Sequence, residues 1–291
     1  MQNIHIIGNG AMACLWASYF SNDQQLNFIL KNKTADTFRF IKEPEHNSIQ
    51  GLAFNLGDLS SPIDYLIIAT KAFDAKKALN SLQPFLHVKT QILLIQNGMG
   101  SQQEIAALYP QLSIYACSST EGVYKPNIQT LIHAGFGTNS IGPLTAPATL
   151  QALKQWLPES HFEWHENIDQ VLWKKLIINA AINPLTVFYN CQNGELIKHD
   201  KQRQHMIRLC SELDKLMIKL PFDMPPAFSL AQDICQRTQY NYSSMYQDVK
   251  KQKQTEITFI TGYIVKTCQS HNIDCPENTK LLNYIQGLPI T

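Results

Sequence analysis

The chain has 291 residues, of which 24 are Lys or Arg and 23 are Asp or Glu, so its formal net charge is +1. A hydrophobic fraction of 44% against a charged fraction of 16% excludes an intrinsically disordered chain. The balanced charge excludes a nucleic-acid scaffold, because phosphate binding needs a dense Lys and Arg surface. The length is sufficient for two domains of ordinary size.

The cysteines and the first residues indicate the compartment, and the cysteines and histidines are also the candidates for metal ligands. The seven cysteines are odd in number and form no Cys-x-x-Cys pair, which predicts reduced thiols rather than a disulfide framework. The cysteines lack metal-site spacing. His161 and His165 are four residues apart, but their segment lacks the His-Glu-x-x-His order and is predicted as a strand, so no metal is predicted. The first residues lack a signal-peptide pattern. The sequence contains no run of about 18 uninterrupted apolar residues, so no membrane span is predicted. We therefore expect a cytoplasmic protein with no membrane or nucleic-acid partner.

The first half of the chain alternates short apolar runs with helical patterns. Strands are predicted at 4–7, 26–30, 65–69 and 92–95, and a helix at 12–20. Continuous apolar runs such as Tyr65–Ala69 are typical of parallel strands covered on both faces. Further strands are predicted at 114–118, 130–134, 139–141 and 162–165 without long helices between them, which indicates an antiparallel extension. The fold class is therefore α/β, with a doubly wound, Rossmann-type domain over residues 1–165.

From residue 167 onward the pattern is helical. Residues 168–189 are apolar on most sides, and apolar residues recur at helical spacing through 206–217. A third helix is predicted over 255–270, and Pro276 suits the first turn of a last one. The second domain, residues 166–291, is therefore predicted to be all-α.

A glycine-rich loop directly follows the first predicted strand and opens a helix. It has the pattern G-x-G-x-x-A of a dinucleotide-binding loop, formed by Gly8, Asn9, Gly10, Ala11, Met12 and Ala13. In this pattern the first glycine permits a tight turn, the second lets the backbone approach a pyrophosphate, and the small last residue lets helix and strand pack closely. An ordinary strand–turn–helix is the alternative, but the position directly after an apolar strand favours a dinucleotide.

The end of the second predicted strand favours NADP over NAD. An NAD enzyme places an acidic residue about 20 residues after the loop, where it binds the ribose 2′-hydroxyl. This chain instead has Lys31 and Lys33 there and no acid, and a cation pairs with a 2′-phosphate. The alternative is that both are ordinary exposed lysines.

A polar stripe interrupts the apolar helix predicted over 168–189. Lys175, Asn179 and Asn183 are four residues apart, so they drift around the helix by only about 40° per step. Burying a lysine and two amides without partners is costly, so the stripe must face water, a ligand or other polar groups. An ordinary solvated face is the alternative, although the stripe is narrow and contains no Glu, Gln or Arg. A lysine in such a cleft can serve as a proton donor.

The sequence around this stripe resembles that of ketopantoate reductase, or 2-dehydropantoate 2-reductase, and the resemblance extends over essentially the whole chain. The Lys-x-x-x-Asn-x-x-x-Asn-Pro helix combined with the distant Ser-Ser-Met and Glu is its most discriminating feature. Ala13 departs from the usual third glycine. The segments that carry the resemblance are the glycine loop and residues 70–72, 96–100, 173–196, 243–248, 255–257 and 260–263.

The resemblance implies a fold like that of 6-phosphogluconate dehydrogenase and an NADPH-dependent reduction of 2-dehydropantoate to (R)-pantoate, on the route to pantothenate and coenzyme A. It implies that Lys175 is the proton donor and that Glu256 contacts the substrate hydroxyl or orients Lys175. The other implied site residues are Asn179, Asn183 and Ser244 for the substrate, Asn97 for substrate and cofactor, and Lys71 for the cofactor. Because ligands bind beyond the carboxyl ends of Rossmann strands, the active site is expected in an interdomain cleft.

Two other functions remain open from the sequence. The first is a related reductase of another branched 2-oxo acid, because substrate choice depends on residues of the pocket wall. The second is a non-catalytic NADP-binding sensor on the same fold. A sensor has no need of the set Lys175, Asn179, Asn183, Ser244 and Glu256. The sequence leaves both a monomer and a homodimer possible.

Overall fold

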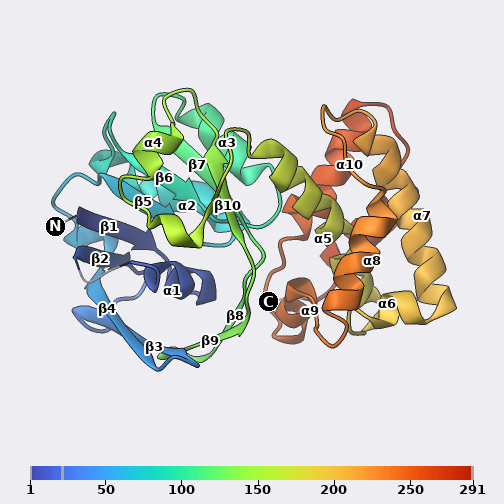
Figure 1. The fold of residues 1–291 in the computed structure, drawn as a ribbon, viewed down its shortest axis with the longest axis horizontal. Coiled ribbons are helices and arrows are strands. Elements are labelled where there is room, and N and C mark those ends of the chain that lie inside the picture. Colours follow the sequence, from blue (N-terminus) through green and yellow to red (C-terminus); the bar gives the residue numbers. More distant parts are fainter. Residues whose placement is uncertain (1, 21–22, 290–291) are drawn as a thin grey trace. The chain divides into compact units, whose positions relative to one another are not determined.

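The computed structural model describes residues 2–20 and 23–289. The chain divides into two compact units (Figure 1). One consists of Met1–Gln96 and Ser101–Asp169, and the other of Asn97–Gly100 and Gln170–Thr291. The short segment Asn97–Gly100 therefore belongs to the second unit, although the residues on both sides of it in the sequence belong to the first.

The first unit is built on one sheet whose strands run in the order β11-β10-β7-β6-β5-β1-β2-β4-β3-β9-β8. Its middle, β7-β6-β5-β1-β2-β4, is parallel. This is the doubly wound α/β class predicted from the apolar runs. The strands are β1 Gln2–Ile7, β2 Gln24–Ile29, β3 Thr37–Glu43, β4 Asn47–Phe54, β5 Tyr65–Ile68, β6 Gln91–Leu94, β7 Ser113–Ser119, β8 Gly122–Asn127, β9 Thr130–Gly135, β10 Asn139–Pro143 and β11 Glu163–Trp164.

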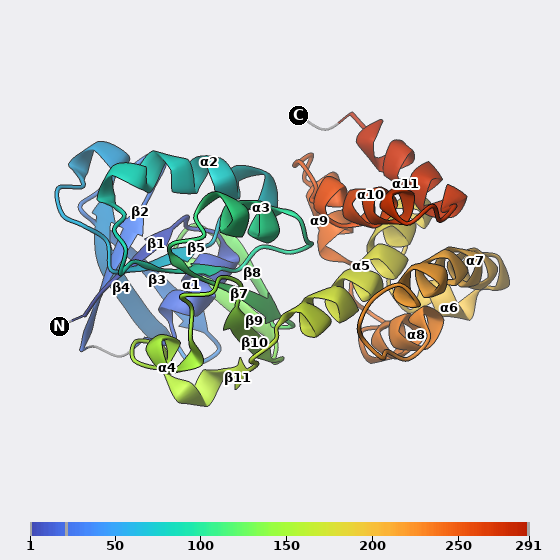
Figure 2. The ribbon, with the colours of Figure 1, turned by 90° about the horizontal axis from the view of Figure 1, so that it is seen from above.

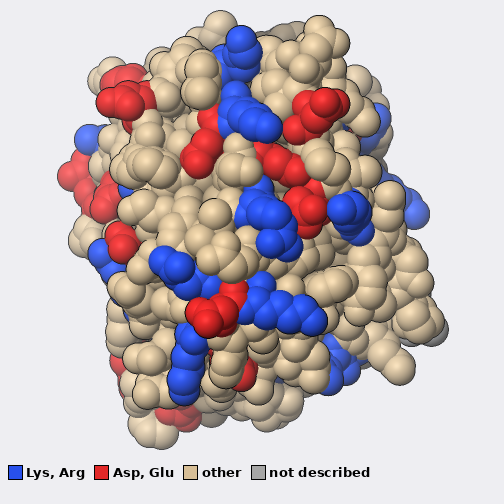
Figure 3. Space-filling model, turned by 90° about the vertical axis from the view of Figure 1, so that its right-hand side faces the viewer, with Lys and Arg blue, Asp and Glu red and all other residues tan. Residues whose placement is uncertain are grey.

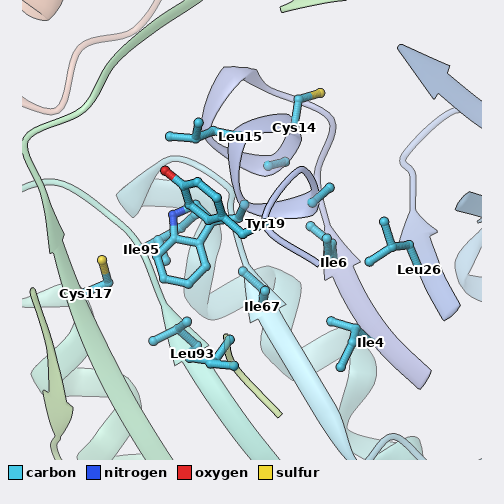
Figure 4. Packing of buried hydrophobic residues seen from close by; sticks show 14 of the residues in the cluster. Ile4, Ile6, Cys14, Leu15, Tyr19, Leu26, Ile67, Leu93, Ile95 and Cys117 are labelled. Carbon is cyan, nitrogen blue, oxygen red and sulfur yellow. The ribbon is translucent and has the colours of Figure 1, made fainter. Parts of the chain in front are cut away.

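Helices cover both faces of this sheet, as continuous apolar strands require. Alternate residues of each strand point to opposite faces: Ile67 and Leu93 join the core cluster around α1, whereas Ile68 and Leu94 join the cluster under α2 and α3 (Figures 2 and 4). The helices of this unit are α1 Ala11–Ala17, α2 Ala72–Leu82, α3 Ser101–Leu108 and α4 Leu150–Leu153.

The predicted antiparallel extension is present, with more strands than the sequence indicated. β7 pairs antiparallel with β10, and β8 with β9, whereas β11 runs parallel to β10. The sequence gave no prediction of β3, β4 or β8. β3 and β4 form a hairpin that continues the sheet past β2. β9 pairs with β3, and β8 and β9 pack on α1 (Figure 1). The first helix is correspondingly shorter than predicted and ends at Ala17.

The second unit is helical, as predicted, apart from the segment 97–100. Its helices are α5 Asp169–Tyr189 (which begins one residue before this unit), α6 Glu195–Lys198, α7 Asp200–Met217, α8 Ala227–Arg237, α9 Ser244–Lys250, α10 Thr261–Ser270 and α11 Pro276–Gln286. Pro276 occupies the first turn of α11, where its missing N–H costs nothing. On the face that Figure 3 presents, Lys and Arg side chains are interspersed with Asp and Glu.

Among the described residues, α5 is the one helix long and apolar enough to cross a membrane. Of the 18 consecutive residues that are its most apolar stretch, 67% are buried inside the fold, as in the core helix of a folded domain. Its buried residues include Leu172, Leu176 and Ala180.

The prediction of a single helix over 255–270 is wrong for residues 255–260. A short 3-10 turn, η4 (Ile257–Phe259), precedes α10, and Ile260 between them has non-helical angles. The Phe259 carbonyl, which a continuous helix would use for the N–H four residues on, accepts instead from the Met99 N–H at 2.8 Å. The segment 97–100 therefore interrupts this helix, and Glu256 lies at the start of the turn.

Candidate functional site

The predicted polar stripe lies on α5 and is not an ordinary solvated face. Lys175 and Asn179 are half-buried, and Asn183 is only 6% exposed. Pro184 follows within the helix, so the carbonyl one turn before it loses its usual N–H donor. A stripe with this burial must be satisfied by polar partners, and the structure supplies some of them from distant segments.

Asn97 connects two of the predicted site residues. The Lys175 Nζ donates to Asn97 Oδ1 at 2.9 Å, and Asn97 Nδ2 donates to Glu256 Oε2 at 3.3 Å. The two contacts fix the orientation of the amide, because its oxygen faces a cation and its nitrogen a carboxylate. Glu256 is 5% exposed, so its carboxylate is held inside the unit. The structure thus brings together Lys175, Asn97 and Glu256, which are separated by up to 159 positions in the sequence.

The loop that carries Asn97 is held by its two glycines. Gly98 has φ +80°, and a Cβ there would collide with the carbonyl of Phe259; Gly100 has φ +99° and lies against the ring of Tyr263. Both angles are in the left-handed region that favours glycine. Met99, between them, is 2% exposed and donates its N–H to Phe259. The loop is therefore closely packed on η4 and α10, which positions Asn97 beside Lys175.

A chain of hydroxyl groups ties the start of α9 to the C-terminal half of α5. Thr186 Oγ1 donates to the carbonyl of Asn183 at 2.8 Å and must therefore accept from Ser243 Oγ, 2.7 Å away. Ser243 Oγ in turn accepts the N–H of Tyr246 at 3.1 Å and caps α9. This chain places the exposed Ser244, the first residue of α9, close to the Asn183 turn of α5. Neither Ser243 nor Thr186 was predicted as a site residue from the sequence, although a Ser before a helical run is a capping signal.

This arrangement can bind an anionic, carbonyl-containing molecule. Lys175 supplies a cation whose direction is set by Asn97, and the amides of Asn179 and Asn183 follow on the same helix face. A cation beside a carbonyl oxygen stabilises negative charge that develops there, and an ammonium also has a proton to give. The site therefore has the groups required for protonating an alkoxide.

The glycine loop in the first unit shows why each glycine is there. Gly8 has φ +113°, and a Cβ would lie 3.2 Å from the Ala69 carbonyl, so its own backbone requires glycine. Gly10 has φ −68°, and a Cβ there would meet nothing within 4 Å. No described residue therefore requires glycine at position 10, and the open space beside it fits the close approach of a dinucleotide pyrophosphate. Ala13 is fully buried against the sheet, as expected of the third small position.

Lysines follow the two strands that flank β1 in the sheet, and another lysine contacts the loop directly. Lys31 is exposed after β2, and Lys71 directly precedes α2 after β5. Lys33, by contrast, pairs with Asp36 at 3.0 Å and with Asp58 at 3.2 Å. Lys125 on β8, which was not predicted as a site residue, donates to the carbonyl of Asn9 at 3.0 Å. No spacing rule could have indicated Lys125, because the contact spans 116 positions and depends on the unpredicted strand β8.

Three comparisons place these features among known proteins. Residues 4–146 match the family model described as ketopantoate reductase PanE/ApbA, and residues 167–288 match ketopantoate reductase PanE/ApbA C terminal. A 2-dehydropantoate 2-reductase of Shigella flexneri is 33% identical over 81% of this chain and 78% of its own length.

Solved structures agree with the family models. The crystal structure of a probable 2-dehydropantoate 2-reductase from Bacillus subtilis has a TM-score of 0.83 and 26% identity, covering 98% of this chain and 99% of its own. A D-mandelate dehydrogenase in a ternary structure with NADH and anilino(oxo)acetate has a TM-score of 0.82 at 21% identity, with coverage of 98% and 97%. This second likeness shows the shared fold.

Proposed function

The chain belongs to the ketopantoate reductase family, and we propose that it reduces 2-dehydropantoate to (R)-pantoate with NADPH. The observation that carries the proposal is the Lys175–Asn97–Glu256 network, which holds an ammonium beside the amides of α5. A binding protein without chemistry gains nothing from a buried carboxylate and an amide that together aim one lysine. We further propose that the protein is cytoplasmic and that the boundary between its cofactor-binding and catalytic domains lies near residue 165.

In the proposed reaction, Lys175 does the acid chemistry. When bound, NADPH supplies the hydride that adds to C2 of the 2-oxo acid. Lys175 Nζ stabilises the negative charge that develops on the C2 oxygen and gives it a proton, after which water returns a proton to the amine. Asn97 keeps the ammonium directed, and Glu256 holds the Asn97 amide in the orientation that accepts from it. Asn179, Asn183 and Ser244 hold the substrate's hydroxyl and carboxylate.

The residues of the first unit fit a dinucleotide. The open space at Gly10 leaves room for the pyrophosphate, and Lys31 follows β2 where a ribose 2′-phosphate is bound in this class of fold. Lys71 places a cation at the N-terminus of α2, where the helix dipole disfavours it, and a nearby phosphate would offset that repulsion. Of these two lysines, Lys31 is the one that favours NADPH over NADH in the proposal, because it follows β2 where the 2′-phosphate would bind.

Gly10→Ala tests the cofactor site without disturbing the fold. Because a Cβ at this position meets no protein atom, the Tm is expected to change by less than about 2 °C, whereas the Kd for NADPH rises by about tenfold or more because the methyl group occupies the pyrophosphate's space. The measurements are thermal unfolding and fluorescence titration with NADPH. Unchanged affinity would remove the loop from the binding site, and a large loss of Tm would mean that position 10 is needed by the protein alone.

Oxidation of NADPH by the purified protein with 2-dehydropantoate tests the activity. We expect rapid, substrate-dependent loss of absorbance at the nicotinamide band and a much lower kcat/KM with 2-oxoisovalerate, which lacks the hydroxyl group that the amides and Ser244 would bind. Faster turnover of 2-oxoisovalerate would assign the chain to a different 2-oxo acid. Binding of NADPH with no oxidation by any 2-oxo acid would favour the sensor.

A further inference from the structure

The end of β2 carries a compact ion-pair group outside the catalytic residues. Lys33 Nζ lies 3.0 Å from Asp36 Oδ1 and 3.2 Å from Asp58 Oδ2. The Lys33 side chain is 21% exposed, that of Asp58 41% and that of Asp36 95%. Asp58 is therefore the better shielded partner of Lys33, and its attraction is less weakened by water than that of Asp36.

Asp58 is held in place by the backbone as well as by Lys33. Its Oδ2 accepts the N–H of Asn55 at 2.8 Å, and Asn55 Oδ1 accepts the N–H of Lys33 at 3.1 Å. These bonds join the turn after β4 to the segment after β2. The Asn55 N–H, and then Lys33, hold the pKa of Asp58 below its usual range, while Asp36 and Asp58 raise the pKa of Lys33. Both partners therefore stay charged at neutral pH.

This pairing changes the charge at the place where a ribose 2′-phosphate binds. The four side chains Lys31, Lys33, Asp36 and Asp58 sum to zero formal charge, although the local sequence shows two lysines. Lys31 is exposed and forms no ion pair with any described residue, so its charge is not neutralised and it can bind a phosphate. Lys33 is committed to the two aspartates.

We propose that Asp58 is a residue that determines cofactor selectivity: it holds Lys33 away from the 2′-phosphate and so limits the preference for NADPH over NADH to what Lys31 alone provides. The inference rests on the proposed function in that the ligand is a nicotinamide dinucleotide. Releasing Lys33 would add a second cation for the phosphate. NADH has a free 2′-hydroxyl there and gains little from the same change.

Asp58→Asn is the variant that tests this proposal. The amide oxygen of Asn can still accept the Asn55 N–H, so the turn is kept while the charge is removed. We expect the Kd for NADPH to fall by about three- to tenfold and the Kd for NADH to change by less than about twofold, since the released lysine gains one exposed charge-assisted contact with the phosphate. Both are measured by titration of the protein without substrate, with adenosine 2′,5′-bisphosphate as a competitor that lacks the nicotinamide half.

A double-mutant cycle separates release of Lys33 from simple removal of a negative charge. In a Lys33→Met background, Asp58→Asn should improve NADPH binding much less than in the wild-type background. Asp36→Asn, at the more exposed carboxylate, should have the smaller effect. Equal effects of Asp58→Asn in both backgrounds, or an unchanged ratio of the two Kd values, would overturn the proposal.

Lys31→Met shows whether a failure lies in this inference or in the proposed function. If Lys31→Met weakens NADPH selectively and Asp58→Asn changes nothing, the 2′-phosphate site stands and Asp58 has no role in selectivity. If the wild-type protein binds neither NADPH nor NADH, the proposed cofactor is wrong, and the role of Asp58 is overturned with it.

Discussion

Lys175→Met is expected to lower kcat for 2-dehydropantoate by about 10²- to 10⁴-fold, the usual contribution of a positioned acid. Met keeps the length and apolar stem of the side chain but removes both the proton and the charge that stabilises the developing alkoxide. Because the glycine loop lies in the first unit, the Kd for NADPH should stay within about twofold of the wild-type value. The measurements are steady-state kinetics and titration with NADPH.

Lys174→Met is the matched control. Lys174 adjoins Lys175 on α5 but is exposed, so its removal changes the same net charge and should alter kcat by less than about twofold. Equal activity of the two variants would exclude Lys175 as the proton donor.

Gly98→Ala is expected to lower both activity and stability. The residue has φ +80°, and the new Cβ would collide with the Phe259 carbonyl, so the loop must move. Backbone strain of about 1–3 kcal/mol should lower the Tm by several degrees. Displacing Asn97 from Lys175 should lower kcat by about 10²-fold, the effect of a misplacement of roughly 1 Å.

Gly57→Ala provides the comparison for Gly98→Ala, because a Cβ at Gly57 meets nothing within 4 Å. Thermal unfolding and kcat at saturating substrate should both be near wild type in this control. A Gly98→Ala protein that unfolds at a lower temperature yet turns over at the normal rate would show that the loop stabilises the unit without directing Lys175.

The parts of the fold that could be predicted are those with continuous apolar runs. β5 and β6 are buried on both faces, so nearly every residue is apolar and the pattern is unambiguous. β3 alternates the buried Phe38 and Phe40 with the exposed Arg39 and Ile41, a weaker signal, and the exposed β8 has almost none. β3 and β8 form because they pair with neighbouring strands beyond β2, and the local sequence does not show where those partners lie.

The candidate site divides in the same way. The stripe of Lys175, Asn179 and Asn183 follows from helical spacing alone, because all three lie on one helix. Asn97 and Glu256 were expected through the family resemblance, and no periodicity could bring them to Lys175. The pairing of Lys33 with Asp58 was beyond prediction, because it depends on the turn after β4.

The segment Asn97–Gly100 belongs to the second unit but lies in the first half of the sequence, so the residues proposed for catalysis are divided between the two halves of the gene. A protein cut at residue 165 would keep Lys175 and Glu256 in its second piece but leave Asn97, which accepts from Lys175 and donates to Glu256, in the first. Recombination between relatives must therefore transfer this loop together with η4 and α10. Otherwise the transferred half lacks the Asn97 contact that orients Lys175. For an engineer building chimaeras, the useful crossover points are those that keep residues 97–100 and 256–263 from the same parent.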